Sequence, residues 1–151
     1  MVAFVTNKTE SGGMDDDDSA FDLAEFLPYL LNEAAESAAS GFAAIYRRDY
    51  GMLRAEWRAL FHLGRYGDMS ASEIGRRAHL HKTKVSRAVR ALEAKRFLVR
   101  GGGESDRRVE ILSLSPAGRA AYRHLAREAR RYDDALEATM TSEEVATLRR
   151  C

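Results

Sequence analysis

Cations and hydroxyl groups gather on one side of a short helix predicted near the middle of the chain. The helix is expected over residues 83–95, where Val85, Val89 and Leu92 recur at helical spacing and form an apolar face. The other face and the helix start carry the polar side chains Lys82, Thr83, Lys84, Ser86, Arg87 and Arg90. Arginine pairs with guanine, and lysine, serine and threonine contact phosphates or base edges. This face is therefore predicted to contact DNA.

A second basic group follows in a predicted hairpin. Strands are expected at residues 97–99 and 109–114, joined by a turn that contains Gly101–Gly103. Near its tip lie Asp106, Arg107 and Arg108. Arginine on a thin loop can enter a narrow minor groove, where the electrostatic potential is most negative. Asp106 is expected to hold one of the arginines in place rather than to contact DNA.

The charge is divided unevenly along the chain, although the net charge is only +1. Residues 1–46 sum to −8, residues 47–110 to +8, and residues 111–151 to +1. A surplus of this size in the middle third suits a polyanionic partner such as nucleic acid, although a solvated basic face would give the same count.

The elements expected around these side chains form a helix-turn-helix followed by a wing, over residues 53–114. A helix at 53–66 precedes a short helix at 71–78, which Ser70 and Glu73 introduce as a capping box. The basic helix and the hairpin come next. In such an arrangement the second helix of the helix-turn-helix lies in the major groove, and its N-terminal residues contact the bases.

Longer helices flank this segment. Residues 21–47 show a helical apolar stripe that could be ordinary core or a subunit interface, and Pro28 either starts or kinks that helix. Ser115-Pro116 starts a helix expected over 117–140, and a capping box at residues 141–144 opens a last one. Residues 1–20 are predicted to be a disordered acidic tail. The fold class expected is mainly α with a small β-hairpin wing, in a single domain over residues 21–151.

Several classes of protein are disfavoured. The chain has no apolar run of 18 residues and no secretory signal, which predicts a cytoplasmic protein without a membrane partner. Its single cysteine, Cys151, excludes a cysteine-based zinc cluster and is read as incidental rather than redox-active. No phosphate-binding glycine loop and no set of nucleophile, base and acid is recognisable, so neither an enzyme nor a cofactor is predicted.

The residues now described resemble the MarR family of bacterial regulators. The matching motifs are Ser72-Glu73-Ile74-Gly75, Thr83–Arg87, Leu92-Glu93, and above all Asp106-Arg107-Arg108 followed by 112–119. Ser115 stands where the family usually has threonine, and Gly101–Gly103 where it often has proline or charged residues. The resemblance covers roughly residues 23–150 and is strongest over 53–119.

This resemblance implies a homodimer whose terminal helices, 21–47 and 117–151, interlock. Two winged domains would then read a pseudo-palindromic operator, with Thr83, Lys84, Ser86 and Arg87 in the major groove. Arg107 or Arg108 would enter the minor groove, and Asp106 would brace the wing. It also implies a repressor released by a small phenolic or aromatic acid, which binds between the dimer helices and the winged domain.

Three residues are candidates for that effector site, each with a plainer alternative. Trp57 can line a pocket or belong to the core, His62 can meet a carboxylate or pack on its helix, and Arg47 can pair with an acid or lie in a solvated turn. His79 and His81 are two residues apart without an acidic partner nearby. They are a poor metal site and better suited to contact the DNA backbone.

A different class of function remains open on the sequence. A winged helix can serve as a protein-interaction module, with its basic helix as the docking face and no sequence-specific DNA binding. Salt separates the two interpretations, because a protein that neutralises several phosphates loses affinity steeply as salt rises.

Overall fold

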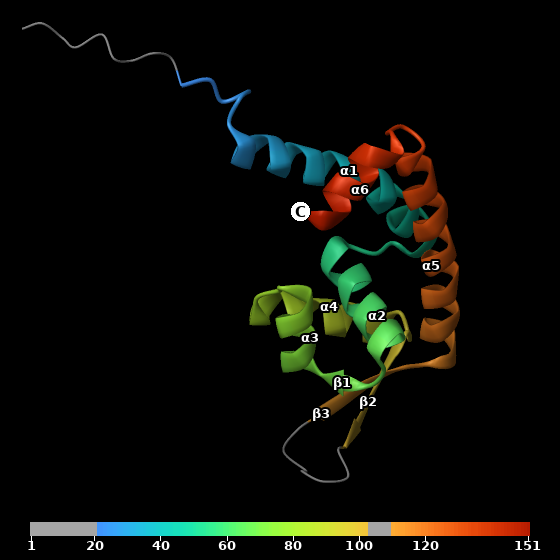
Figure 1. Cartoon of the computed structure of the whole chain (residues 1–151). Coiled ribbons are helices and arrows are strands. Elements are labelled where there is room, and N and C mark those ends of the chain that lie inside the picture. Colours follow the sequence, from blue (N-terminus) through green and yellow to red (C-terminus); the bar gives the residue numbers. More distant parts are fainter. Residues whose placement is uncertain (1–20, 103–109) are drawn as a thin grey trace, which may run out of the picture. The chain divides into compact units, whose positions relative to one another are not determined.

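The computed structural model describes residues 21–102 and 110–151 (Figure 1). Within these ranges the predicted class is confirmed: the chain is mainly helical with a small antiparallel sheet. The elements are α1 (Leu27–Tyr50), α2 (Arg54–Tyr66), β1 (Met69–Ser70), α3 (Ala71–Ala78), α4 (Lys82–Ala94), β2 (Leu98–Gly102), β3 (Glu110–Leu114), α5 (Pro116–Glu137) and α6 (Ser142–Arg150). Residues 1–20, predicted to be disordered, lie outside the described residues. None of the described helices is both long and apolar enough to cross a bilayer.

The chain divides into two compact units, Met1–Ala35 and Glu36–Cys151, and α1 belongs to both. In the described part of the first unit, α1 begins at Leu27, so that Pro28 lies in the first turn. Proline is tolerated there because the N–H that it lacks would have no helical partner. The large apolar side chains in the described part of this unit are exposed, among them Leu27 at 64% and Leu31 at 58%.

The second unit is built around the helix-turn-helix. Helices α2, α3 and α4 pack on one another, and the hairpin of β2 and β3 follows α4 (Figure 1). Leu60 from α2, Ile74 from α3, Leu92 from α4 and Leu112 from β3 are fully buried at their junction. The turn between α3 and α4 begins at His79, whose φ of 50° places it in the left-handed region.

The predicted capping box before α3 forms only in part. The Ser70 hydroxyl accepts a hydrogen bond from the Glu73 amide at 3.2 Å, as expected. The Glu73 carboxylate, however, accepts hydrogen bonds from Arg76 and Arg77 on the next turn instead of reaching back to Ser70. Two guanidinium groups within 2.5–2.9 Å give the carboxylate charged partners, which bind it more strongly than a neutral amide.

The sheet has one strand more than predicted. Its order is β1-β3-β2, with both pairs antiparallel. Leu98 lies opposite Leu114 and Arg100 opposite Leu112, so these four side chains share one face of the hairpin. β1 pairs Met69 with Leu112. Strand β1 was not predicted, because two residues are too few to show an alternating pattern.

The hairpin is tied to α5 by Ser115 and Gly118. The Ser115 hydroxyl accepts from the Gly118 amide at 3.0 Å and donates to the carbonyl oxygen of Arg96 at 2.7 Å. A Cβ on Gly118 would lie 2.0 Å from the carbonyl oxygen of Phe97, so only glycine fits. The predicted Ser-Pro helix start is therefore present, and the capping box of Thr141 and Glu144 before α6 is confirmed.

Candidate nucleic-acid interface

Helix α4 is fixed by its apolar face. Val85, Ala88, Val89 and Leu92 are each at most 3% exposed, and the helix packs against α2 and α3. At its end, the Lys95 ammonium lies 3.2 Å from Oε2 of Glu56, a carboxylate on α2 that is only 5% exposed. The contact is an ion pair whose alignment does not suit a hydrogen bond. The rotation of α4 about its axis is thereby set.

The opposite face of α4 carries all six of the polar residues predicted for it. Lys82, Thr83, Lys84, Ser86, Arg87 and Arg90 are exposed. Within the described ranges, none of the four cations among them forms an ion pair or a side-chain hydrogen bond. Their charge is therefore not neutralised by the described part of the chain, and it is available to an anion that approaches this face.

The turn before α4 is shaped by the two histidines. His81 is the N-cap, and its Nδ1 accepts a hydrogen bond from the Thr83 amide at 3.4 Å. Both His79 and His81 are exposed. Over residues 21–102 and 110–151, no three side chains of metal-ligating type are grouped to hold an ion. The amides of Thr83, Lys84 and Val85 all donate to His81, so at this end of α4 it is the positive end of the helix dipole that favours a phosphate.

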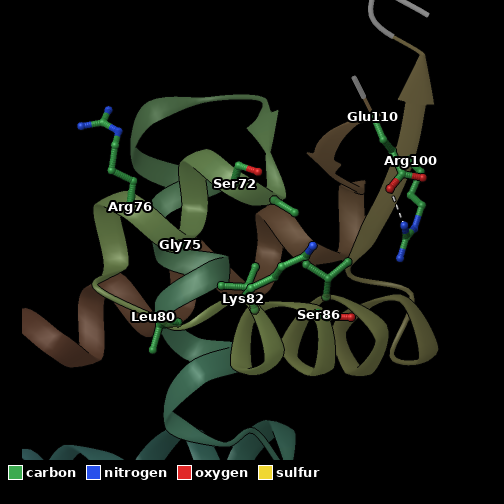
Figure 2. A pocket seen from close by; sticks show the side chains of 11 residues that line it. Ser72, Gly75, Arg76, Leu80, Lys82, Ser86, Arg100 and Glu110 are labelled. Atoms are coloured by element: carbon green, nitrogen blue, oxygen red, sulfur yellow. Dashed lines mark hydrogen bonds and ion pairs between the residues drawn. The ribbon is translucent and has the colours of Figure 1, made fainter. Parts of the chain in front are cut away.

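A groove of about 490 Å³ separates α4 and α3 from the hairpin. Leu80, Val85 and Val89 line its apolar side, while Ser72, Lys82 and Ser86 bring polar groups to it. Figure 2 shows Lys82 and Ser86 on α4 and, across the groove, Arg100 and Glu110 on the two strands. The outward face of α4 and the base of the wing therefore border one concave surface.

The base of the wing holds an ion-pair network that the sequence analysis missed. Arg100 on β2 binds both carboxylate oxygens of Glu93 on α4, with Nη2 at 2.7 Å from Oε2, and its Nη1 binds Glu110 on β3. These carboxylates raise the pKa of Arg100, whose guanidinium in turn lowers the pKa of Glu93. The predicted wing residues Asp106, Arg107 and Arg108 lie outside the described residues.

A second cavity, of about 520 Å³, lies between three helices on another part of the unit. Aromatic rings from all three helices line it: Phe42 of α1, Trp57 and Phe61 of α2, and Tyr122 and Tyr132 of α5. Trp57 packs at 5.1 Å from Phe42 and 5.3 Å from Phe61 between ring centroids. Arg65, Arg130 and Asp133 are its charged lining residues. The cavity suits a flat apolar molecule that carries an acidic group.

Two glycines make room for the tyrosines of this cavity. A Cβ on Gly64 would lie 2.3 Å from the ring of Tyr122, and one on Gly41 would lie 2.4 Å from the hydroxyl of Tyr132. That hydroxyl donates a hydrogen bond to the carbonyl oxygen of Ala38 at 2.7 Å and so joins α5 to α1. The cavity walls therefore depend on close helix approach at positions without a side chain.

Residues 50–109, which run from the end of α1 to the wing, match the model of the MarR family. No curated protein matches the chain. Over this segment, which is less than half of the chain, the chain is similar to the MarR family.

Solved structures share this fold over most of the chain. A probable transcriptional regulator from Pseudomonas aeruginosa is 28% identical, with a TM-score of 0.71 over 85% of this chain and 95% of its own. Streptococcus pneumoniae FabT, solved in complex with DNA, is 23% identical, with a TM-score of 0.66 over 80% and 89%. Bordetella bronchiseptica BpsR, whose DNA binding is regulated by 6-hydroxynicotinic acid, is 19% identical, with a TM-score of 0.65 over 79% and 92%. At these last two identities the likeness concerns the fold alone.

Within this winged-helix fold the three candidate effector residues are separated. Trp57 lines the aromatic cavity, whereas Arg47 is exposed in the last turn of α1 and His62 lies outside the cavity lining. The His62 ring stacks on Tyr66 at 5.7 Å, and burial lowers its pKa. The two cations that line the cavity, Arg65 and Arg130, were not predicted from the sequence. They line one cavity only because α2 and α5 pack together.

Proposed function

We propose that this chain is a sequence-specific DNA-binding transcription regulator of the MarR family, which reads the major groove with α4. The observation that carries the proposal is the division of α4: one face is locked in the core, and the other holds four cations with no partner in the described part of the chain. Thr83, Ser86 and Arg87 would contact base edges, while Lys82, Lys84 and Arg90 would contact phosphates. In the wing, Arg107 or Arg108 would enter the minor groove and Asp106 would hold the arginine in place.

A selection experiment tests this function. The purified full chain is used to select double-stranded DNA from a random pool, and the recovered sequence is compared with a scrambled version by fluorescence anisotropy at several salt concentrations. We expect a pseudo-palindromic sequence bound at least about a thousandfold more tightly than the scrambled DNA at physiological salt. Log affinity should fall steeply with log salt.

The same selection experiment can contradict the proposal. If no sequence is enriched and both DNAs bind equally weakly, the winged helix does not read DNA sequence. The alternative, a protein-interaction module that docks an acidic partner on α4, would then be favoured. FabT in complex with DNA supports the first interpretation.

We further propose that the functional unit is a homodimer. Exposed apolar side chains crowd the first unit, where Phe21 is 69%, Leu27 64% and Leu31 58% exposed, and Leu148 of α6 is 59% exposed in the second. Apolar groups at this density are unfavourable in water unless a partner covers them. A second copy would cover them and would place two copies of α4 on a pseudo-palindromic site.

Sedimentation velocity tests the dimer. The full chain should sediment with twice the mass of its 151 residues. Leu31→Glu should shift the population toward the monomer, whereas Val99→Glu, at a 50% exposed position on β2, should not. A wild-type chain that is monomeric at micromolar concentration would rule the dimer out.

The aromatic cavity is our proposed effector site, and the ligand class is a small aromatic acid. Five aromatic rings would sandwich the ligand, and Arg65 or Arg130 would pair with its carboxylate. Binding would favour an arrangement of the dimer unsuited to DNA, so the protein would act as a repressor that the acid releases. The regulation of BpsR by 6-hydroxynicotinic acid supports this part of the proposal.

Thermal shift with a panel of acids tests the site. Benzoate, 4-hydroxybenzoate and 6-hydroxynicotinate would be compared with cyclohexanecarboxylate, which lacks the aromatic ring. A ligand at a hundred times its Kd stabilises the folded chain by about 2.7 kcal/mol. Arg130→Ala should weaken the response, and Arg131→Ala, an exposed neighbour paired with Glu128, should not. If no acid raises Tm, the cavity is not an aromatic-acid site.

A further inference from the structure

The network around Arg100 joins three elements at the base of the wing. Arg100 lies on β2, Glu93 on the last turns of α4, and Glu110 at the start of β3. In the strand register Arg100 faces Leu112, so Glu110 is its diagonal neighbour on the same face of the hairpin. Figure 2 shows the Arg100 and Glu110 side chains turned toward one another, with a dashed line between them. The guanidinium group of Arg100 on β2 therefore binds both β3 and α4.

The geometry of the contact to α4 is specific. Nε and Nη2 of Arg100 bind the two oxygens of Glu93, and Nη1 binds Glu110. A bidentate pair of this kind fixes the orientation of both groups as well as their distance, because the guanidinium is planar and its donors diverge at set angles. A lysine at this position would supply the charge but not the orientation.

The charge of the network distinguishes it from the outward face of α4. One cation is shared between two carboxylates, so the three side chains together carry a net charge of −1. Arg100 is therefore not free to bind a phosphate, unlike Lys82 across the same groove. The network cannot add to DNA affinity through its own charge.

Its contribution to fold stability is also small. The side chains of Arg100, Glu93 and Glu110 are 38%, 29% and 50% exposed. Ion pairs in contact with water stabilise a fold only slightly, because solvent screens the charges and ordering the side chains costs entropy. A small gain in fold stability does not explain why the guanidinium group of Arg100 makes three hydrogen bonds to two carboxylates.

We propose that Arg100 is a positioning residue for DNA binding, which fixes the wing strands against α4 so that both meet one DNA site together. The inference rests on the proposed function, because it assumes that α4 reads DNA. Without the Arg100–Glu93 pair, the hairpin would pivot on its apolar base at Leu98 and Leu114, and the alignment needed for simultaneous contact would be lost.

A charge-conserving double variant tests the positioning role. Arg100→Gln with Glu93→Gln removes one positive and one negative charge, so the net charge of the chain is unchanged. We expect affinity for the selected DNA to fall about tenfold or more, which is the effect of losing one well-placed contact. Affinity for scrambled DNA and the salt dependence should stay within about twofold of the wild type, because both report charge. Tm should change little.

The control is Glu110→Gln, which leaves the bidentate pair with Glu93 in place. It should keep the preference for the selected DNA, and its extra net positive charge should raise affinity for both DNAs slightly. The positioning role is overturned if the double variant binds the selected DNA as the wild type does, or loses both DNAs equally. A wild-type chain that selects no sequence removes the proposed function and this inference together, whereas a selective wild type with an unaffected double variant removes only the inference.

Discussion

The outward face of α4 and the aromatic cavity are built in opposite ways. The α4 face consists of exposed cations and hydroxyls along one side of a helix whose other side is buried. The cavity consists of partly buried rings brought together from α1, α2 and α5. A surface for a long polyanion needs reachable charge along one element, whereas a site for a small apolar molecule needs walls on several sides. Changes at one site should therefore leave the intrinsic chemistry of the other intact.

The largest effect that separates the two regions is expected from Gly64→Ala. The new Cβ would lie 2.3 Å from the Tyr122 ring, so the ring must leave its place on the cavity wall. Overpacking of this kind costs about 1–3 kcal/mol. The Tm, measured by calorimetry, should fall by roughly 2–12 °C. The response to aromatic acids should be lost, while the folded variant keeps its preference for the selected DNA. Loss of that preference at a temperature where the variant is folded would show that the regions are not separable.

A smaller, spectroscopic effect is expected at Trp57, the only tryptophan of the chain. Its indole lies in the cavity between Phe42 and Phe61, so an aromatic acid that binds there should change its emission. Titration with DNA alone should change the emission less, since α4 presents a different surface. An acid that releases DNA without changing Trp57 fluorescence would place the effector outside the cavity.

The smallest effect is expected from pH at Glu73, on the helix before α4. Hydrogen bonds from Arg76 and Arg77 lower the pKa of this carboxyl from 4.5 to about 2. A carboxyl whose pKa is lower in the folded state stabilises the fold above its unfolded pKa and loses that contribution as pH falls. The Tm difference between the wild type and Glu73→Gln should therefore be present at pH 6 and shrink between about pH 4.5 and pH 2. An equal difference at pH 6 and pH 2.5 would contradict the ion pairing.

The same contrast explains what the sequence could predict. The α4 face was predictable, because its signal is local: thirteen consecutive residues contain both the apolar stripe and the polar one. Ser115-Pro116 and the capping box at Thr141 are local signals as well, and both correspond to helix starts. The bounds of the elements shifted. Helix α1 ends at Tyr50 rather than at residue 47, and β2 runs to Gly102, although Gly101 and Gly102 were predicted to lie in the turn.

The aromatic cavity and the Arg100 network could not be predicted, because they depend on residues that are distant in the chain. The cavity joins Phe42 to Tyr132, and Arg65 and Arg130 line the same cavity only after α2 and α5 pack. Arg100 shows no motif of its own, because its role follows from strand register and from the direction of α4. Glu73 satisfies a capping pattern in sequence, yet two nearby guanidinium groups compete for its carboxylate.

The most direct test of the central claim is the affinity of Arg87→Ala for the selected DNA. Arg87 is exposed on the outward face of α4, and loss of one bidentate contact to a base costs about 1–3 kcal/mol. We expect affinity to fall roughly 10- to 100-fold and the preference at one base position to relax. Arg127→Ala, which removes an exposed arginine from α5, is the matched control and should bind as the wild type does. If Arg87→Ala keeps wild-type affinity and preference, or if Arg127→Ala loses as much, α4 is not the element that reads the DNA.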